Sequence, residues 1–282
     1  MAKISSSPLR DKNAIESASF AIVLNEPLNS EFDAIKQACL DLKDELPGDE
    51  AIAPPFGLFQ QAAGGAPLNL PFNFPPIGLS RFSTNRDGSR EWQLDVNGNL
   101  IVANCFNYTN HAEVWAKMRK LITTVISATS HDFNIVEIGY QVVDKFLYPA
   151  NADLSEYDIF EVFSKTSPFL TSQASKSNHL WHVHQGWFDT EPTSHMRLLN
   201  QLNLASNEVI APEAQLVTII DHRVSLRPNP NQLTLKPLII GDEDEPSQLD
   251  HFFESLRSCN RKTIENLLNS DKLNSVGIMS KK

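Results

Sequence analysis

The order of strand-like and helix-like segments constrains the fold of this chain more strongly than any other feature of the sequence. In the first 150 residues, strand patterns cover 14–24, 79–84, 90–104 and 134–146, and amphipathic helix patterns cover 30–46 and 110–125. Along the chain they read strand, helix, strand, strand, helix, strand, which is typical of the split βαβ arrangement. We therefore predict an α+β protein whose residues 1–150 form a ferredoxin-like half, with two helices on one face of an antiparallel sheet.

Residues 151–282 predict a second half, a mostly antiparallel sheet closed by a long C-terminal helix. We expect a short helix over 155–163, strands over 179–188, 196–203, 215–226 and 233–240, and the final helix from 247 onward. Helix starts are indicated by pairs at capping spacing: Ser30 and Asp33, Asn110 and Glu113, Ser155 and Asp158, Ser247 and Asp250. We place the boundary between the two halves near residues 149–154. The sequence does not decide whether the strands of both halves form a single continuous sheet.

Residues 51–80 contain six prolines and no charged side chain. This proline content excludes an interior helix or a central strand. The segment also carries four phenylalanines: Phe56, Phe59, Phe72 and Phe74. Such an apolar segment packs either on its own protein or on a partner. In the second case, the four phenylalanines form an interaction loop.

Charge and composition exclude several classes of protein. The net charge of −10 argues against nucleic acid as the main ligand. Three widely separated cysteines indicate neither a disulfide framework nor a zinc cage, and they suit a reducing cytoplasm. The usual phosphate-loop, dinucleotide and hydrolase signatures are absent, as are a signal peptide and a membrane-length apolar run. We therefore expect a cytoplasmic protein without a cofactor and without a membrane partner.

Five segments carry a resemblance to a known family: AIESASFAIVLNEPL, RFSTNRDGSREWQLDVNGNLIVANCFNYTNHAEVW, NIVEIGYQVVDKFLYP, QLVTIIDHRVSLRP and LDHFFESLRSCNRKTIENLLNSDKL. On these patterns the chain resembles a sporadically distributed, uncharacterised family of prokaryotic conserved hypothetical proteins of about this size. Its helix tryptophan corresponds to Trp115, and its C-terminal helix residues to His251 and Asn260. The resemblance implies a fold and a prokaryotic source, and a patchy distribution that suits mobile defence or toxin–antitoxin genes.

The histidine-rich strand is one candidate site. His182 and His184 share a face of a strand, because side chains alternate along it. Together with Asp221 from a neighbouring strand they could hold a divalent metal. The alternative, a half-buried strand whose histidines pair across the sheet, is the favoured interpretation, because a metal site needs at least three converging ligands.

Two further polar groups stand out. Asp221, Arg223, Ser225 and Arg227 share one strand face, which is either a ligand groove or, as we favour, a solvated face with cross-strand ion pairs. Arg257 and Arg261 are one helical turn apart, so two guanidinium groups could clamp an anion or a partner's carboxylates. A surface helix with neighbouring acids is the simpler interpretation of this pair.

These features lead to a hypothesis of a non-catalytic cytoplasmic interaction protein. It would act as an accessory, regulatory or neutralising partner of another, basic protein, in a prokaryotic defence or toxin–antitoxin type of system. The alternatives are a metal-dependent hydrolase or nuclease using His182, His184 and Asp221, and a single-stranded RNA-binding module. The sequence neither predicts nor excludes a homo-oligomer.

Overall fold

The computed structural model describes residues 5–10, 12–52, 78–150, 152–177, 179–191, 194, 196–209, 215–241 and 246–278. Its strands are β1 (Ser7–Pro8), β2 (Ile15–Leu24), β3 (Gly48–Ile52), β4 (Gly78–Thr84), β5 (Arg90–Asn97), β6 (Leu100–Cys105), β7 (Ile135–Leu147), β8 (Trp181–Thr190), β9 (Arg197–Val209) and β10 (Gln215–Arg227). Its α-helices are α1 (Phe32–Cys39), α3 (His111–Ala128), α4 (Gln248–Leu267) and α5 (Ser270–Ser275).

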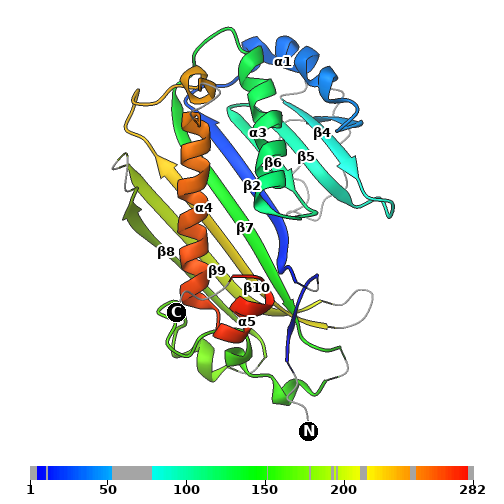
Figure 1. The fold of residues 1–282 in the computed structure, drawn as a ribbon, viewed down its shortest axis with the longest axis vertical. Helices are drawn as coiled ribbons and strands as arrows, with labels where there is room; N and C mark the ends of the chain where they lie inside the picture. The colour runs from blue at the N-terminus through cyan, green and yellow to red at the C-terminus, as the bar shows by residue number, and fades with distance from the viewer. Residues whose placement is uncertain are drawn as a thin grey trace, which may run out of the picture.

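All ten strands belong to one antiparallel sheet, in the order β3-β4-β5-β6-β2-β7-β10-β9-β8, with β1 also paired to β7. The α+β class and the antiparallel sheet are therefore confirmed. Strand β7, from the first part of the chain, pairs with β2 on one side and with β10 on the other. The sheet thus runs without interruption from the N-terminal to the C-terminal strands (Figure 1).

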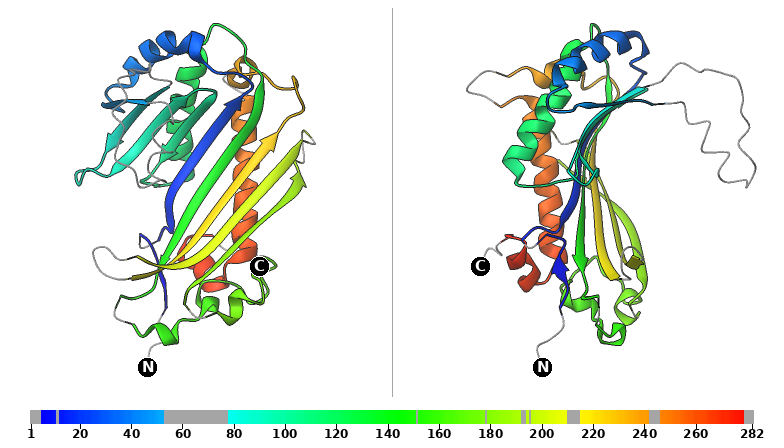
Figure 2. Two further views of the ribbon diagram at one scale, coloured as in Figure 1. Left: turned by 180° about the vertical axis from the view of Figure 1, so that it is seen from behind. Right: turned by 90° about the vertical axis from the view of Figure 1, so that its right-hand side faces the viewer.

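Helices α1, α3 and α4 lie on the same face of the sheet (Figure 2). Helix α3 contacts β6, and α4 contacts β7 and β10. The alternation along the strands explains this arrangement, because every second residue of β2 is buried toward the helices: Ala18, Phe20, Ile22 and Leu24. Among the described helices, none is long and apolar enough to cross a membrane.

Helix α4 is fixed to α3 near its N-terminus. The predicted capping box is present, since Ser247 and Asp250 exchange side-chain-to-backbone hydrogen bonds. Asp250 also accepts a hydrogen bond from Trp115 Nε1 at 2.8 Å and pairs with Arg119 at 3.1 Å. The Trp115 ring stacks on Phe253, with centroids 3.8 Å apart. This cluster fixes where α4 crosses the sheet.

Three local predictions were wrong. The pair Ser30 and Asp33 forms no cap, because α1 follows directly on a 3-10 turn (Asn29–Glu31) and ends at Cys39. The helix expected over 155–163 is two 3-10 turns, Leu154–Glu156 and Ile159–Glu161. The strand expected over 233–240 is a 3-10 turn, Lys236–Ile239, because Pro237 has no N–H for a strand ladder.

The proposed interaction loop lies outside the described residues, since Phe56, Phe59, Phe72 and Phe74 all fall within 53–77.

Candidate ligand pocket

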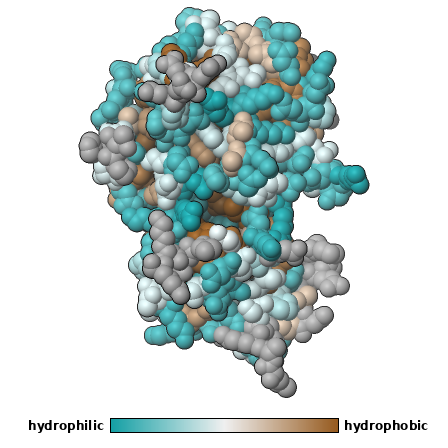
Figure 3. Space-filling view, in the orientation of Figure 1, coloured by the Kyte–Doolittle hydropathy of each residue, from teal (hydrophilic) through white to brown (hydrophobic). Residues whose placement is uncertain are grey.

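A cavity of about 400 Å³ lies between α4 and the sheet. Its walls come from four parts of the chain: residues 12–15 at the start of β2, residues 108–111 between β6 and α3, residues 140–146 of β7, and residues 257–278 of α4 and the segment after it. Figure 3 shows apolar residues in the hollow between α4 and the strands, with hydrophilic residues around it.

A buried carboxyl group forms part of the floor. Asp144 of β7 is 8% exposed, and among the described residues no group donates a hydrogen bond to it. Its partners across the sheet are Ile220 of β10 and Ile15 of β2, which have no polar side chain. Burial disfavours the charged carboxylate, so the pKa of Asp144 is raised to about 7. The pairing of β2 with β7 is irregular between Ile15 and Ser17, next to Asp144.

Two tyrosines flank this carboxyl group. Tyr140 precedes Asp144 by four residues and therefore lies on the same face of β7. Tyr108 comes from the segment after β6. Burial raises the pKa of Tyr108 to about 12 and raises that of Tyr140 as well. Within the described part of the chain, neither hydroxyl makes a hydrogen bond to a side chain or to the backbone. The floor therefore presents three polar groups that the described residues leave without a hydrogen-bond partner.

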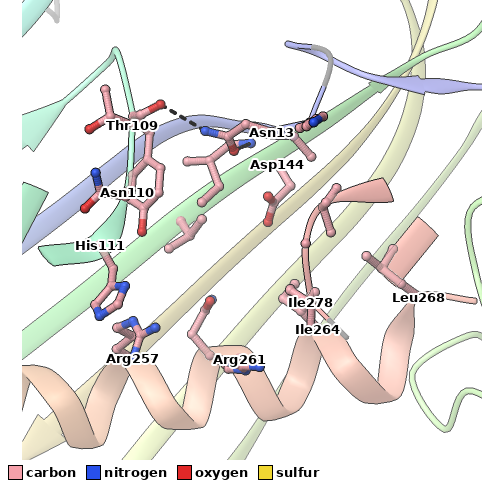
Figure 4. A pocket seen from close by; sticks show the side chains of 18 of the residues that line it. Asn13, Thr109, Asn110, His111, Asp144, Arg257, Arg261, Ile264, Leu268 and Ile278 are labelled. Carbon is pink, nitrogen blue, oxygen red and sulfur yellow. Dashed lines mark hydrogen bonds between the residues drawn. The ribbon is translucent and has the colours of Figure 1, made fainter. Parts of the chain in front are cut away.

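Basic side chains line the pocket above this floor: Lys12, His111, Arg257 and Arg261. Figure 4 shows His111 beside Arg257, while Asp144 points from β7 toward α4. Arg257 Nη1 donates to Glu254 at 2.8 Å, and Arg261 Nε donates to Glu265 at 3.0 Å. The surface-helix interpretation is thus correct in part. Each guanidinium has five N–H donors, however, so one glutamate does not use its capacity to bind an anion.

The loops around the pocket are tied together by hydrogen bonds. Asn13 Nδ2 donates to the Tyr108 carbonyl at 2.9 Å, and Asn13 Oδ1 accepts from the Ile15 N–H at 2.9 Å. His111 is the first residue of α3, whose predicted cap is confirmed: Asn110 Oδ1 accepts from the Glu113 N–H at 3.1 Å. The bond from Asn13 ties the backbone at Tyr108 to the start of β2, and the cap fixes the first turn of α3, which begins at His111.

Asn260 on the pocket side of α4 is held by a buried histidine. Asn260 Nδ2 donates to His222 Nδ1 at 3.0 Å, and His222 Nε2 donates to Asn200 Oδ1 at 3.2 Å. Asn200 in turn donates to Asp189 at 3.0 Å, and Cys259 donates to Asn200 Oδ1 at 3.2 Å. Burial lowers the pKa of His222 to about 4, so the ring is neutral and the network assigns its proton to Nε2.

The residues proposed for a metal site lie on the opposite face of the sheet, which α1, α3 and α4 do not cover. The register places Asn203 of β9 directly between His184 and Asp221. Asn203 hydrogen bonds with His184 and donates to Asp221 at 3.3 Å. His182 lies opposite Ala205. The structure therefore does not bring the three together, and no group of three or more His, Cys, Asp or Glu among the described residues could hold a metal ion.

The same open face carries the polar row of β10. Arg223 and Arg227 both pair with Glu137 of β7, and Asp221 accepts from Gln141 Nε2 at 2.7 Å. These are the cross-strand ion pairs and hydrogen bonds that the sequence favours for this row.

Sequence analysis found Arg257 and Arg261 but missed Asp144, Tyr140 and Tyr108. One signal was available, because Asp144 interrupts the apolar alternation Ile138, Tyr140, Val142, Phe146 on the face that the helices cover. In comparisons with family models, curated proteins and solved structures, no match to this chain was found.

Proposed function

We propose that this protein is a non-catalytic interaction protein that holds an anionic group of another molecule in the pocket beneath α4. The observation that carries the proposal is the convergence of Lys12, His111, Arg257 and Arg261 on one cavity of a chain whose net charge is −10. Guanidinium groups bind carboxylates and phosphates through paired, charge-assisted hydrogen bonds. A cavity with several basic groups in an otherwise acidic protein therefore suits a specific anion better than general attraction to polyanions.

The test compares what the protein carries when it is purified from its own cells. Native mass spectrometry of the wild type is compared with Arg257→Gln/Arg261→Gln and with a control, Arg86→Gln/Arg197→Gln, which removes two exposed arginines outside the pocket. We expect the wild type and the control to retain a bound molecule with an anionic group, and the pocket variant to lose most of it. Equal retention by all three proteins, or no bound molecule in the wild type, contradicts the proposal.

The further features inferred from the sequence belong to the same proposal. They are membership of the sporadically distributed prokaryotic family, a cytoplasmic role in a defence or toxin–antitoxin type of system, and a partner protein that contacts residues 51–80. The order β7-β2-β6-β5, with α1 after β2 and α3 between β6 and β7, supports a ferredoxin-like description of the first half.

Contact of a partner protein with 51–80 has its own test. Deletion of residues 56–74 should leave the protein folded and abolish its complex with the partner. An insoluble deletion variant would show that the segment belongs to the core instead.

A further inference from the structure

The pocket combines basic groups, a buried carboxyl group and apolar side chains. Arg257, Asn260, Arg261 and Ile264 face the cavity from one side of α4, over about 10 Å of helix, and Leu268 lines it directly after the helix ends. Basic side chains therefore occupy one end of this row, and aliphatic side chains occupy the other. Asp144 faces the same cavity from β7, between Val142 and Phe146 on the same face of the strand. A ligand that fills the cavity thus meets a cationic end, apolar walls and a buried carboxyl group.

We propose that the ligand is a small zwitterion, with its anionic group at Arg257 and Arg261, its ammonium group at Asp144, and an aliphatic body between them. This inference rests on the proposed function, since it assigns the anionic end to the same arginines. It goes further by naming a second, oppositely charged group that the ligand must carry.

The need for an ammonium group follows from the surroundings of Asp144. Four of the segments that line the cavity supply charged or titratable groups: Lys12 before β2, Tyr108 and His111 after β6, Tyr140 on β7, and Arg257 and Arg261 on α4, whereas Val276, Gly277 and Ile278 supply none. Among the described residues, none of these groups donates a hydrogen bond to Asp144. Buried carboxyl groups in folded proteins are hydrogen-bonded by protein groups or by ordered water. Asp144 faces the cavity, so a ligand there can supply the donor in place of water, and we assign it this role.

A neutral donor would suit a protonated carboxyl group, but a cationic donor makes the stronger, charge-assisted bond. The apolar side chains of the lining suit the carbon body of the ligand. Val142 and Phe146 of β7, Ile264 of α4, and Leu268 and Ile278 after α4 line the same cavity. A carbon chain there removes apolar surface from water on both sides, and about 400 Å³ is ample for a molecule of amino-acid size.

The experiment is calorimetric titration of the full chain with three matched series of probes. The zwitterions are γ-aminobutyrate, ε-aminocaproate and ω-aminocaprylate. The anions are butyrate, caproate and caprylate, and the cations are the alkylammonium ions of the same lengths. We expect the best zwitterion to bind about tenfold or more tightly than the anion and the cation of its length, because only it forms both charge-assisted contacts.

Variants separate the two ends of the ligand. Asp144→Asn should reduce the affinity of the zwitterion to that of the matched anion and leave the anion unchanged. Arg257→Gln/Arg261→Gln should lower the affinity for both the zwitterion and the anion and leave the affinity for the alkylammonium ion unchanged. Asp33→Asn, at an exposed position on α1, is the control for the loss of one negative charge.

The affinity for the zwitterion should also increase with pH. The ammonium group of the ligand and the proton of Asp144 compete for the same carboxyl oxygens. The affinity of the zwitterion should therefore rise as the pH increases toward about 7, the raised pKa of Asp144, and then level off. The matched anion, titrated in parallel, accounts for charge changes among the basic groups at the other end.

The outcomes distinguish this inference from the proposed function. If zwitterion and anion bind equally and Asp144→Asn changes neither, the zwitterion assignment is overturned, while weaker anion binding in the arginine variant still upholds the proposed function. If the anions bind equally to the wild type and to the arginine variant, the proposed function fails as well. Absence of binding by every probe overturns both.

Discussion

Replacing Asp144 by asparagine should stabilise the folded protein at alkaline pH. The pKa of this carboxyl group is about 7 in the folded protein and 3.8 ordinarily. The unfolded chain therefore loses this proton at a lower pH than the folded chain does. The contribution of Asp144 to stability is fully present below pH 3.8 and is lost as the pH rises through about 7. At about 1.4 kcal/mol for each unit of pKa, the loss amounts to roughly 4 kcal/mol.

Urea denaturation of both proteins at about pH 4 and about pH 8 measures this loss, because all other titrating groups are shared and cancel in the comparison. At each pH the free energy of unfolding of the wild type is subtracted from that of Asp144→Asn. This difference should be roughly 4 kcal/mol larger at the higher pH. Asp33→Asn, on the exposed side of α1, controls for the change in net charge. A difference that is the same at both pH values would refute the reasoning, since it would mean that Asp144 ionises alike in the folded and unfolded chains.

Other substitutions test the framework around the pocket. Ser247→Ala removes the capping box with Asp250 and should lower the free energy of unfolding by about 1 kcal/mol in urea titrations; no loss would mean that the cap adds nothing to α4. Asn260→Ala leaves His222 Nδ1 without a donor and should lower the free energy of unfolding by about 1–3 kcal/mol in the same titrations. An unchanged free energy of unfolding would mean that water replaces the lost amide. Glu137→Gln breaks two ion pairs on the open face, so it should destabilise by about 1 kcal/mol at low salt and less at high salt; an effect independent of salt would argue against a coulombic origin.

The strands and the two long helices could be predicted because their patterns are repeated over many residues. The alternation in β2 and β7 and the helical spacing in α3 and α4 each recur several times, so one misplaced residue does not hide them. The capping pair at Ser155 and Asp158 is a single local signal. Asp158 does cap a backbone N–H, that of Phe160 at 2.9 Å, but the turn that follows is 3-10 and ends after three residues.

The site was harder to predict than the fold, because the pairing of strands that are distant in the sequence decides which side chains lie close together. The two-residue spacing placed His182 and His184 on one face of β8, and Asp221 was expected on a neighbouring strand, but β9 lies between β8 and β10 and puts Asn203 between His184 and Asp221. The arginine pair was found because both residues belong to one helix. Asp144 lies more than a hundred residues before Arg257, and only the packing of α4 over β7 brings them to one cavity.

The structure supports α4 on both sides of the pocket, and this has a consequence for binding. Near its start the helix is held by Asp250 and by the stack of Phe253 on Trp115, and farther along by the bond from Asn260 to the buried ring of His222. Arg257 therefore lies on a turn of helix that is anchored before and after it. A ligand does not have to order this helix in order to bind, so little of the interaction energy is lost to immobilising the protein. The carboxyl group of Asp144, to which no described residue donates a hydrogen bond, opposes folding once it is ionised. An apolar residue at this place in the sheet would avoid that cost, so a carboxyl group beside a cavity is better explained by the binding that we propose than by packing alone.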